Sequence, residues 1–234
     1  MAAEPNYISG ASGLAAVVFN AFGVLFVMGV ENAYRPGTLD RWMYNAIQHD
    51  EATTWSAGCF AVGAMLLLPW VVGMARALGP YSWPGASMVA GAALLNALGS
   101  VFPAVVVHQL PHGEDALGQT LLGLTLVIDS GFNLIFGAGL LLLGLAMARD
   151  RHFPMWLAVF GIVAGLPTMG AFSEAWSVTG SNVVALAGPL WLIWVAVASL
   201  HLTRMRWDRV QVHVHAADAK RLPLAAPSDA SMGA

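Results

Sequence analysis

A carboxylate interrupts one of the long apolar segments of this chain. Asp129 and Asn133 stand one helical turn apart in the segment 116–147, which is otherwise almost entirely apolar. An ionisable side chain inside a membrane span costs about 2.5–3.5 kcal/mol on insertion scales and marks a functional site by default. Asn96 and Ser100 fall at a similar depth of the preceding apolar segment. These four side chains, together with Thr125, are therefore predicted to line one polar pocket, and we expect a ligand to bind there.

The role of Asp129 in such a pocket has two interpretations. As a catalytic residue, it would act as a general acid, or it would orient the head group of a substrate. As a structural residue, it would only form a hydrogen bond between neighbouring helices. The sequence leaves both open.

A second group of titratable side chains surrounds the start of the same segment. His108 and His112 are four residues apart, a spacing that places two imidazoles on one face of a helix, although Pro111 interrupts it. Glu114 follows, and His49 precedes the second apolar segment on the same side. Imidazole with carboxylate is a ligand set for zinc, iron or copper. We predict a transition-metal site here; the alternative is a set of hydrated polar loops, since no spacing matches a strong metal motif.

One further acid, Glu174, follows the fifth apolar segment on that side. It could bind the ligand or complete the metal site. A solvated loop acid is the alternative, because Glu174 lies in a polar stretch and acids are mostly exposed.

The composition indicates a helical membrane protein with several spans. Of the 234 residues, 58% are hydrophobic and 10% are charged, whereas soluble domains carry about 25% charged residues. Long apolar runs without strand-like alternation favour helices over a barrel. The single cysteine, Cys59, rules out an internal disulfide and a thiolate metal cluster. The predicted fold class is all-α, a polytopic transmembrane helix bundle.

Six segments are predicted to span the membrane, within a membrane domain of residues 1–207. Before the second of them, the segment 38–49 has one apolar face and is predicted to form a short helix in the outer interface. Residues 208–234 are predicted to be a disordered cytoplasmic tail. The six spans are predicted at approximately 14–30, 53–74, 86–107, 119–147, 154–172 and 183–203.

The distribution of arginine predicts the orientation. Arg35 and Arg41 lie on one side of the predicted spans, and no lysine or arginine precedes Arg35, so a cleaved signal peptide is not expected. By the positive-inside rule, both termini are predicted to be cytoplasmic. The arginine-rich side carries Arg76, Arg149, Arg151, Arg204, Arg206 and Arg209.

One stretch resembles a known family. Residues 128–166 are similar to bacterial multi-spanning integral-membrane proteins catalogued as a domain of unknown function. The resemblance implies a protein of the bacterial plasma membrane and carries over no catalytic residue. The shared pattern is Asn133-x-x-x-Gly137, a leucine run ending at Gly144, a short basic loop with Pro154, and a small-residue helix ending in Gly165-Leu166.

Two classes of function follow from these patterns. The first is a membrane protein that binds a metal or a lipid-soluble ligand, including a small membrane enzyme acting on a lipid or an isoprenoid. The alternative is a non-catalytic subunit that binds lipid, pigment or partner helices in a larger complex or a homo-oligomer. Nucleic acid is not an expected partner, because no basic patch is present.

Overall fold

The computed structural model describes residues 5–29, 39–109, 115–175 and 178–205. It divides the chain into two units, Met1–Arg204 and Met205–Ala234, and every element below belongs to the first. No strand occurs among the described residues. The elements are α1 (Pro5–Gly29), α2 (Leu39–Gln48), α3 (Asp50–Leu78), η1 (Pro80–Ser82), α4 (Trp83–Gly99), α5 (Val101–Gln109), α6 (Asp115–Arg149), α7 (Met155–Gly170), η2 (Ala171–Ala175) and α8 (Val178–Arg204).

The predicted all-α membrane fold is confirmed. Within the described ranges, six helical segments are long and apolar enough to cross a membrane, with α4 and α5 together forming the third. The chain is therefore a multi-pass membrane protein. Helix α1 is longer than the predicted first span, because it already begins at Pro5.

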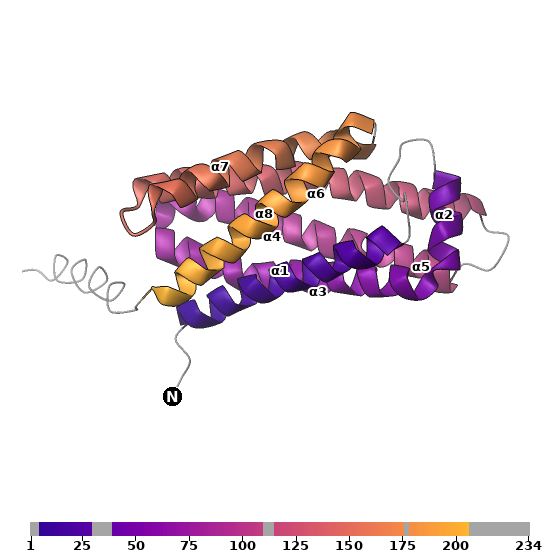
Figure 1. Ribbon diagram of the computed structural model, residues 1–234, viewed down its shortest axis with the longest axis horizontal. Helices are drawn as coiled ribbons and strands as arrows, with labels where there is room; N and C mark the ends of the chain where they lie inside the picture. Colours follow the sequence, from indigo (N-terminus) through magenta and orange to yellow (C-terminus); the bar gives the residue numbers. More distant parts are fainter. Residues whose placement is uncertain (1–4, 30–38, 110–114, 176–177, 206–234) are drawn as a thin grey trace, which may run out of the picture. The chain divides into compact units, whose positions relative to one another are not determined.

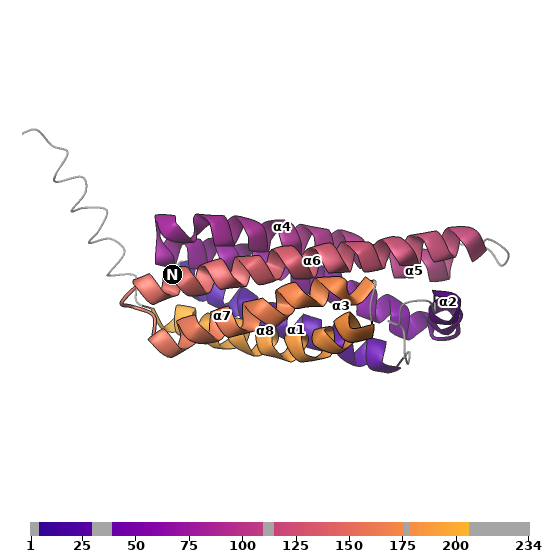
Figure 2. The ribbon, with the colours of Figure 1, turned by 90° about the horizontal axis from the view of Figure 1, so that it is seen from above.

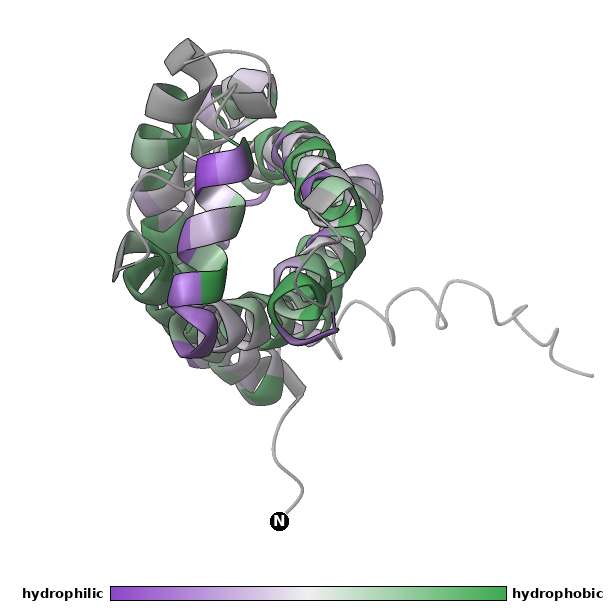
Figure 3. Cartoon of the chain, turned by 90° about the vertical axis from the view of Figure 1, so that its right-hand side faces the viewer, coloured by the Kyte–Doolittle hydropathy of each residue, from purple (hydrophilic) through white to green (hydrophobic). Residues whose placement is uncertain are grey.

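The six spans run side by side along the bundle (Figures 1 and 2), and their contacts close into a ring. The order around the ring is α1, α3, α4, α6, α7 and α8, and α8 returns to α1. Figure 3 looks along the helices and shows this ring from the end that α2 crosses. A ring of this kind leaves room on its axis wherever the inward side chains are small.

Glycines allow the closest helix contacts in the ring. A methyl group on Gly137 of α6 would lie 2.5 Å from the backbone nitrogen of Met169 and 2.7 Å from the carbonyl oxygen of Gly165, both in α7. A methyl group on Gly85 of α4 would lie 3.0 Å from the carbonyl oxygen of Gly139 in α6. Backbones approach this closely in membranes only where residues are small. These contacts fix α6 between α4 and α7.

The predicted third span is present, but it consists of two helices with a break between them. Helix α4 ends at Gly99 and α5 begins at Val101. Pro103 explains the break, because it has no N–H and its ring clashes with the carbonyl group four residues earlier. Ser100 caps the end of α4: its backbone N–H donates to the carbonyl oxygen of Asn96 at 2.9 Å, and its hydroxyl donates to the same oxygen at 2.6 Å.

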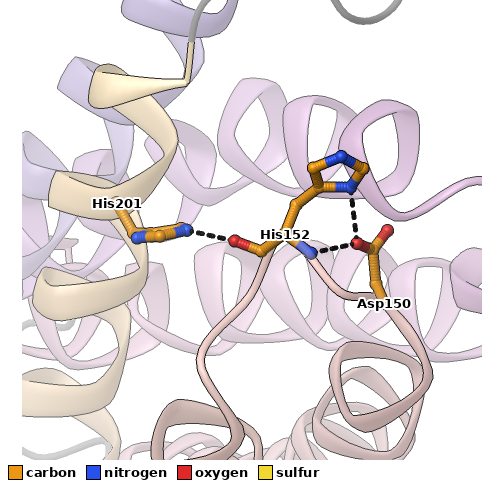
Figure 4. A network of polar contacts seen from close by, with 3 residues as sticks. All are labelled: Asp150, His152 and His201. Atoms are coloured by element: carbon orange, nitrogen blue, oxygen red, sulfur yellow. Dashed lines mark hydrogen bonds and ion pairs between the residues drawn. The ribbon is translucent and has the colours of Figure 1, made fainter.

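The turn between α6 and α7 is tied to the end of α8. The Nε2 atom of His201 lies 2.9 Å from the carbonyl oxygen of His152, and the Nδ1 atom of His152 lies 2.8 Å from Asp150 Oδ1 (Figure 4). This end of the bundle is basic. Its described and exposed arginines are Arg76, Arg149, Arg151 and Arg204.

Helix α2 lies across the opposite end of the ring (Figures 1 and 3). Its Trp42 is only 4% exposed, and the hydroxyl group of Thr53 in α3 donates to the carbonyl oxygen of Ala46 at 3.2 Å. The sequence predicts a short helix here because its apolar residues share one face. In the structure, that face packs on a cluster formed by α5 and α6, which contains Val106, Leu122 and Leu126.

Aromatic side chains fill the interior of the ring toward its basic end. Trp70 and Trp194 meet edge to face with ring centroids 5.9 Å apart, and Phe136 meets Trp191 in the same way at 5.1 Å. The indole N–H of Trp194 donates to the carbonyl oxygen of Leu157 at 2.9 Å. These rings close the axis of the bundle on that side, so any open space must lie between them and α2.

Candidate functional site

A cavity of about 580 Å³ occupies the interior of the ring between α2 and the aromatic residues. Its walls come from α1, α3, α4, α5, α6 and α8, and Trp42 of α2 also contributes to the lining. Ligand pockets for small molecules typically measure about 300–1,000 Å³ and are mostly apolar with a few polar groups. This cavity has the size and the composition of such a pocket.

The structure brings together the polar residues predicted from the third and fourth spans. All five predicted residues line the cavity: Asn96, Ser100, Thr125, Asp129 and Asn133. They come from the broken end of α4 and from one face of α6, which pack against each other. Whether these side chains bind a ligand or act in catalysis stays a prediction.

The end of α4 lies directly against Asp129. A methyl group on Gly99 would lie 2.7 Å from the Ile128 Cγ2 atom and 3.8 Å from Asp129 Oδ1. Helix α4 can therefore reach α6 at this level only because residue 99 has no side chain. The close approach places Ser100 and the carboxyl group of Asp129 on the same wall of the cavity.

The carboxyl group of Asp129 faces the cavity without a partner in the protein. Across the described residues, it takes part in no hydrogen bond and no ion pair. The side chain is half-buried and opens into the cavity. Polar groups buried in a membrane protein are normally paired, because an unpaired one costs free energy. An unpaired carboxyl group on a cavity wall is thus available to a ligand.

The opposite wall adds polar side chains that the sequence analysis missed. Asn20 of α1 and Thr53 and Ser56 of α3 line the cavity across from Asp129. Asn20 donates to the carbonyl oxygen of Ala16 at 2.8 Å, and Ser56 donates across to the carbonyl oxygen of Gly23 in α1 at 3.1 Å. A lone amide inside the first apolar segment was a usable signal for Asn20. Thr53 and Ser56 could not be distinguished from ordinary small residues of a helix interface.

Aromatic and aliphatic side chains make up the rest of the lining. Four aromatic side chains border the cavity, from four different helices: Trp42, Phe60, Phe132 and Trp191. Phe132 stacks on Phe136 with centroids 5.0 Å apart, which continues the aromatic layer beneath the cavity. The polar groups therefore form a band within an apolar enclosure.

The cavity extends to the outer surface of the bundle between α1 and α8. Near the basic end these helices are in close contact, since a methyl group on Gly10 would lie 2.8 Å from the carbonyl oxygen of Ser199. They diverge toward α2 (Figure 1). There, Val24 and Met28 line the cavity although they are 41% and 70% exposed, and the exposed Ala185 of α8 lines it as well. In a bilayer these exposed side chains contact lipid.

The residues predicted to bind a metal are only partly described. His49 is exposed in the turn between α2 and α3, and His108 shares a hydrogen bond of 2.7 Å with Thr54 Oγ1. His112 and Glu114 lie outside the described residues. Among the residues that the structure describes, no three His, Cys, Asp or Glu side chains are grouped to hold a metal. The metal site stays a prediction.

Glu174, the remaining predicted site residue, falls in η2. Only its backbone belongs to the described part of the chain, so its proposed contribution to ligand binding or to a metal site also stays a prediction. Helix α8 follows η2 and carries Trp191 to the cavity.

No protein-family model, no curated protein and no solved structure matches this chain. The resemblance over residues 128–166 accordingly stays an expectation. The function has to be argued from the cavity itself.

Proposed function

We propose that this membrane protein binds a lipid-soluble ligand in the cavity at the centre of its helix ring. The carboxyl group of Asp129 carries the proposal, because it lines a cavity of about 580 Å³ and has no partner among the described residues. A purely structural carboxyl group would instead form a hydrogen bond between helices. The ligand would place its polar head beside Asp129 and its apolar part among the aromatic side chains.

The shape of the cavity favours entry from the bilayer. It opens between α1 and α8, where its lining side chains are exposed on the lipid-facing surface. At the end of the bundle, α2 lies over one side of the ring, and its Trp42 is packed against α5 and α6. A ligand that dissolves in the membrane can reach the opening without crossing water.

An interior cavity with side access favours ligand binding over a role as a bare partner subunit. A subunit that only docks against other helices requires an outer surface and has no use for a polar cavity. A ligand-binding subunit of a larger complex remains compatible with the structure. A catalytic role of Asp129 as a proton donor would require a bound substrate whose reacting atom lies beside its carboxyl group.

The basic end of the bundle sets the proposed orientation. Its exposed arginines, at positions 76, 149, 151 and 204, contrast with the single exposed arginine described at the other end, Arg41. We infer that the basic end is cytoplasmic and that α2 lies on the outer side of a bacterial plasma membrane. The arginine count and the resemblance stated above support this placement.

The binding test uses two adjacent residues of α3, one on the cavity side and one on the exposed side. Ala57 lines the cavity and is buried, whereas Gly58 is exposed and a methyl group there would meet nothing within 4 Å. Ala57→Phe fills the cavity, and Gly58→Phe adds the same ring on the lipid-facing side. The probe is Nile red, a neutral apolar dye, titrated into full-length protein in lipid nanodiscs with empty nanodiscs subtracted.

We expect saturable Nile red binding to the wild type and to Gly58→Phe, with at least a tenfold loss of affinity in Ala57→Phe. Thermal unfolding of the three proteins reports whether each variant is folded. Equal affinity of folded Ala57→Phe and the wild type would place the dye elsewhere. The absence of saturable binding to the wild type would also contradict the proposal.

A further inference from the structure

We propose that the ligand is an apolar amine, and that its ammonium group binds between Asp129 and the hydroxyl oxygens of the cavity. This inference rests on the proposed function of the cavity and adds the chemical class of the ligand. Two properties of the cavity lining support it: the balance of hydrogen-bond donors and acceptors, and the sign of the charge.

The hydroxyl groups of the cavity present acceptors, because their protons are already used. A hydroxyl group has one proton to donate and two lone pairs to accept. The hydroxyl group of Ser100 donates to the carbonyl oxygen of Asn96 at 2.6 Å, and that of Thr125 donates to the carbonyl oxygen of Leu121 at 3.2 Å.

The two hydroxyl groups of α3 follow the same pattern. Thr53 donates to the carbonyl oxygen of Ala46 at 3.2 Å, and Ser56 donates to the carbonyl oxygen of Gly23 at 3.1 Å. All four hydroxyl oxygens that line the cavity on α3, α6 and at the end of α4 can thus still accept hydrogen bonds. A head group that donates several hydrogen bonds fits this arrangement.

Two prolines, in α5 and α8, leave further backbone acceptors near the cavity. Pro103 and Pro189 line the cavity and have no N–H. The carbonyl groups four residues earlier, at Gly99 and Ala185, therefore lack the helical donor that they would otherwise have. Gly99 adjoins Asp129, and Ala185 lines the cavity at the opening beside α1.

The charge of the cavity has one sign. Asp129 is the acid of the lining, and no lysine, arginine or histidine is among the described residues that line the cavity. The donors of the lining are the amides of asparagine and the indoles of tryptophan, which are neutral. An anionic head group would meet a carboxyl group with no cation to balance it. An ammonium group would pair with that carboxyl group.

The aromatic side chains around the polar band also favour a cation. Phe60, Phe132 and Trp191 line the cavity together with Asp129. The face of an aromatic ring attracts an ammonium group, and the attraction is stronger when water is excluded. The same rings accommodate the apolar part of an amine. The combination of one carboxyl group, hydroxyl acceptors and aromatic faces is thus selective for a primary amine with an apolar body.

The test compares three probes with the same eight-carbon tail: octylamine, octanol and octanoate. Each is titrated by calorimetry into full-length protein in nanodiscs, with empty nanodiscs subtracted. We expect octylamine to bind the wild type at least tenfold more tightly than octanol or octanoate. Asp129→Asn keeps the size of the side chain and removes the charge, and we expect it to lower octylamine affinity at least tenfold.

Two controls test whether a loss of octylamine binding in Asp129→Asn comes from the lost local charge. The first examines folding of the variant, and the second examines long-range electrostatic attraction. Cooperative thermal unfolding of Asp129→Asn, together with saturable octanol binding at any affinity, would show that the variant is folded and that its cavity is open. Asp40→Asn removes an exposed carboxyl group from α2 outside the cavity and should leave octylamine binding unchanged.

The outcomes distinguish the two proposals. If octanol and octylamine bind the wild type equally, or if Asp129→Asn retains full octylamine affinity, the amine proposal is wrong while the binding cavity stands. If none of the three probes binds the wild type saturably, the proposed function fails together with it.

Discussion

Replacing Trp42 by alanine tests whether α2 is held over the cavity by a single side chain. Trp42 is 4% exposed, packs on Val106, Leu122 and Leu126, and borders the cavity. Truncating a buried tryptophan to alanine costs about 3–5 kcal/mol, and the lower end applies here because one side of the ring faces a cavity. The loss of about 3 kcal/mol would raise the opening equilibrium of α2 about a hundredfold.

The other contacts of α2 are smaller: Ala46 is buried, and Leu39 and Met43 are only partly buried against the same cluster. A helix of ten residues is marginal on its own in water. The described hydrogen bond from Thr53 to the carbonyl oxygen of Ala46 contributes only about 0.5–1.5 kcal/mol. The six spans pack against one another without α2, so the opening should be local.

Hydrogen exchange measured by mass spectrometry on protein in nanodiscs follows this opening. We expect amides 39–48 to exchange about a hundredfold faster in Trp42→Ala, and amides of α3 and α6 deep in the bundle to keep their wild-type rates. Tyr44→Ala is the matched control, because this aromatic residue of the same helix is 63% exposed. Unchanged exchange of α2 in Trp42→Ala, or equal effects of both variants, would refute this account of how α2 is held.

Two further predictions concern packing and orientation. Gly137→Ala should lower the free energy of unfolding of the purified protein by about 1–2 kcal/mol, because a methyl group 2.5 Å from a backbone atom costs more than the helix propensity that alanine gains. The control is Gly131→Ala, where a methyl group meets nothing within 4 Å, and this variant should be neutral or stabilising. A larger loss of stability in Gly131→Ala than in Gly137→Ala would contradict the packing. In a Cys59→Ser background, a membrane-impermeant maleimide added to intact cells should label Arg41→Cys, and should label Arg76→Cys only after permeabilisation; the opposite pattern would invert the proposed orientation.

Much of the fold could be predicted from local sequence. The apolar runs fix the number of spans, because a bilayer excludes unpaired backbone groups and so requires helices of a set length. The apolar face of 38–49 predicts the short helix α2. The break at Ser100 had a sequence signal in Pro103, but whether a proline bends or ends a helix depends on the neighbours that receive the freed carbonyl group.

The sequence by itself determined the polar half of the candidate site. A carboxyl group inside a span is costly enough to stand out, and depth along two neighbouring spans is enough to group Asp129 with Asn96, Ser100 and Asn133. Local pattern cannot show what lies across from that group, because helices distant in the chain supply it. Only the closed ring brings Asn20, Ser56 and Trp191 of α1, α3 and α8 to the same space.

Tertiary structure also decided whether these polar side chains only form hydrogen bonds between helices or instead line a cavity. The answer depends on the volume left by side chains of six helices and on the divergence of α1 from α8, neither of which has a periodic signature in sequence. The donor and acceptor balance of the cavity is likewise tertiary in origin. Ser56 becomes an acceptor toward the cavity only because its proton reaches the carbonyl oxygen of Gly23 on a neighbouring helix.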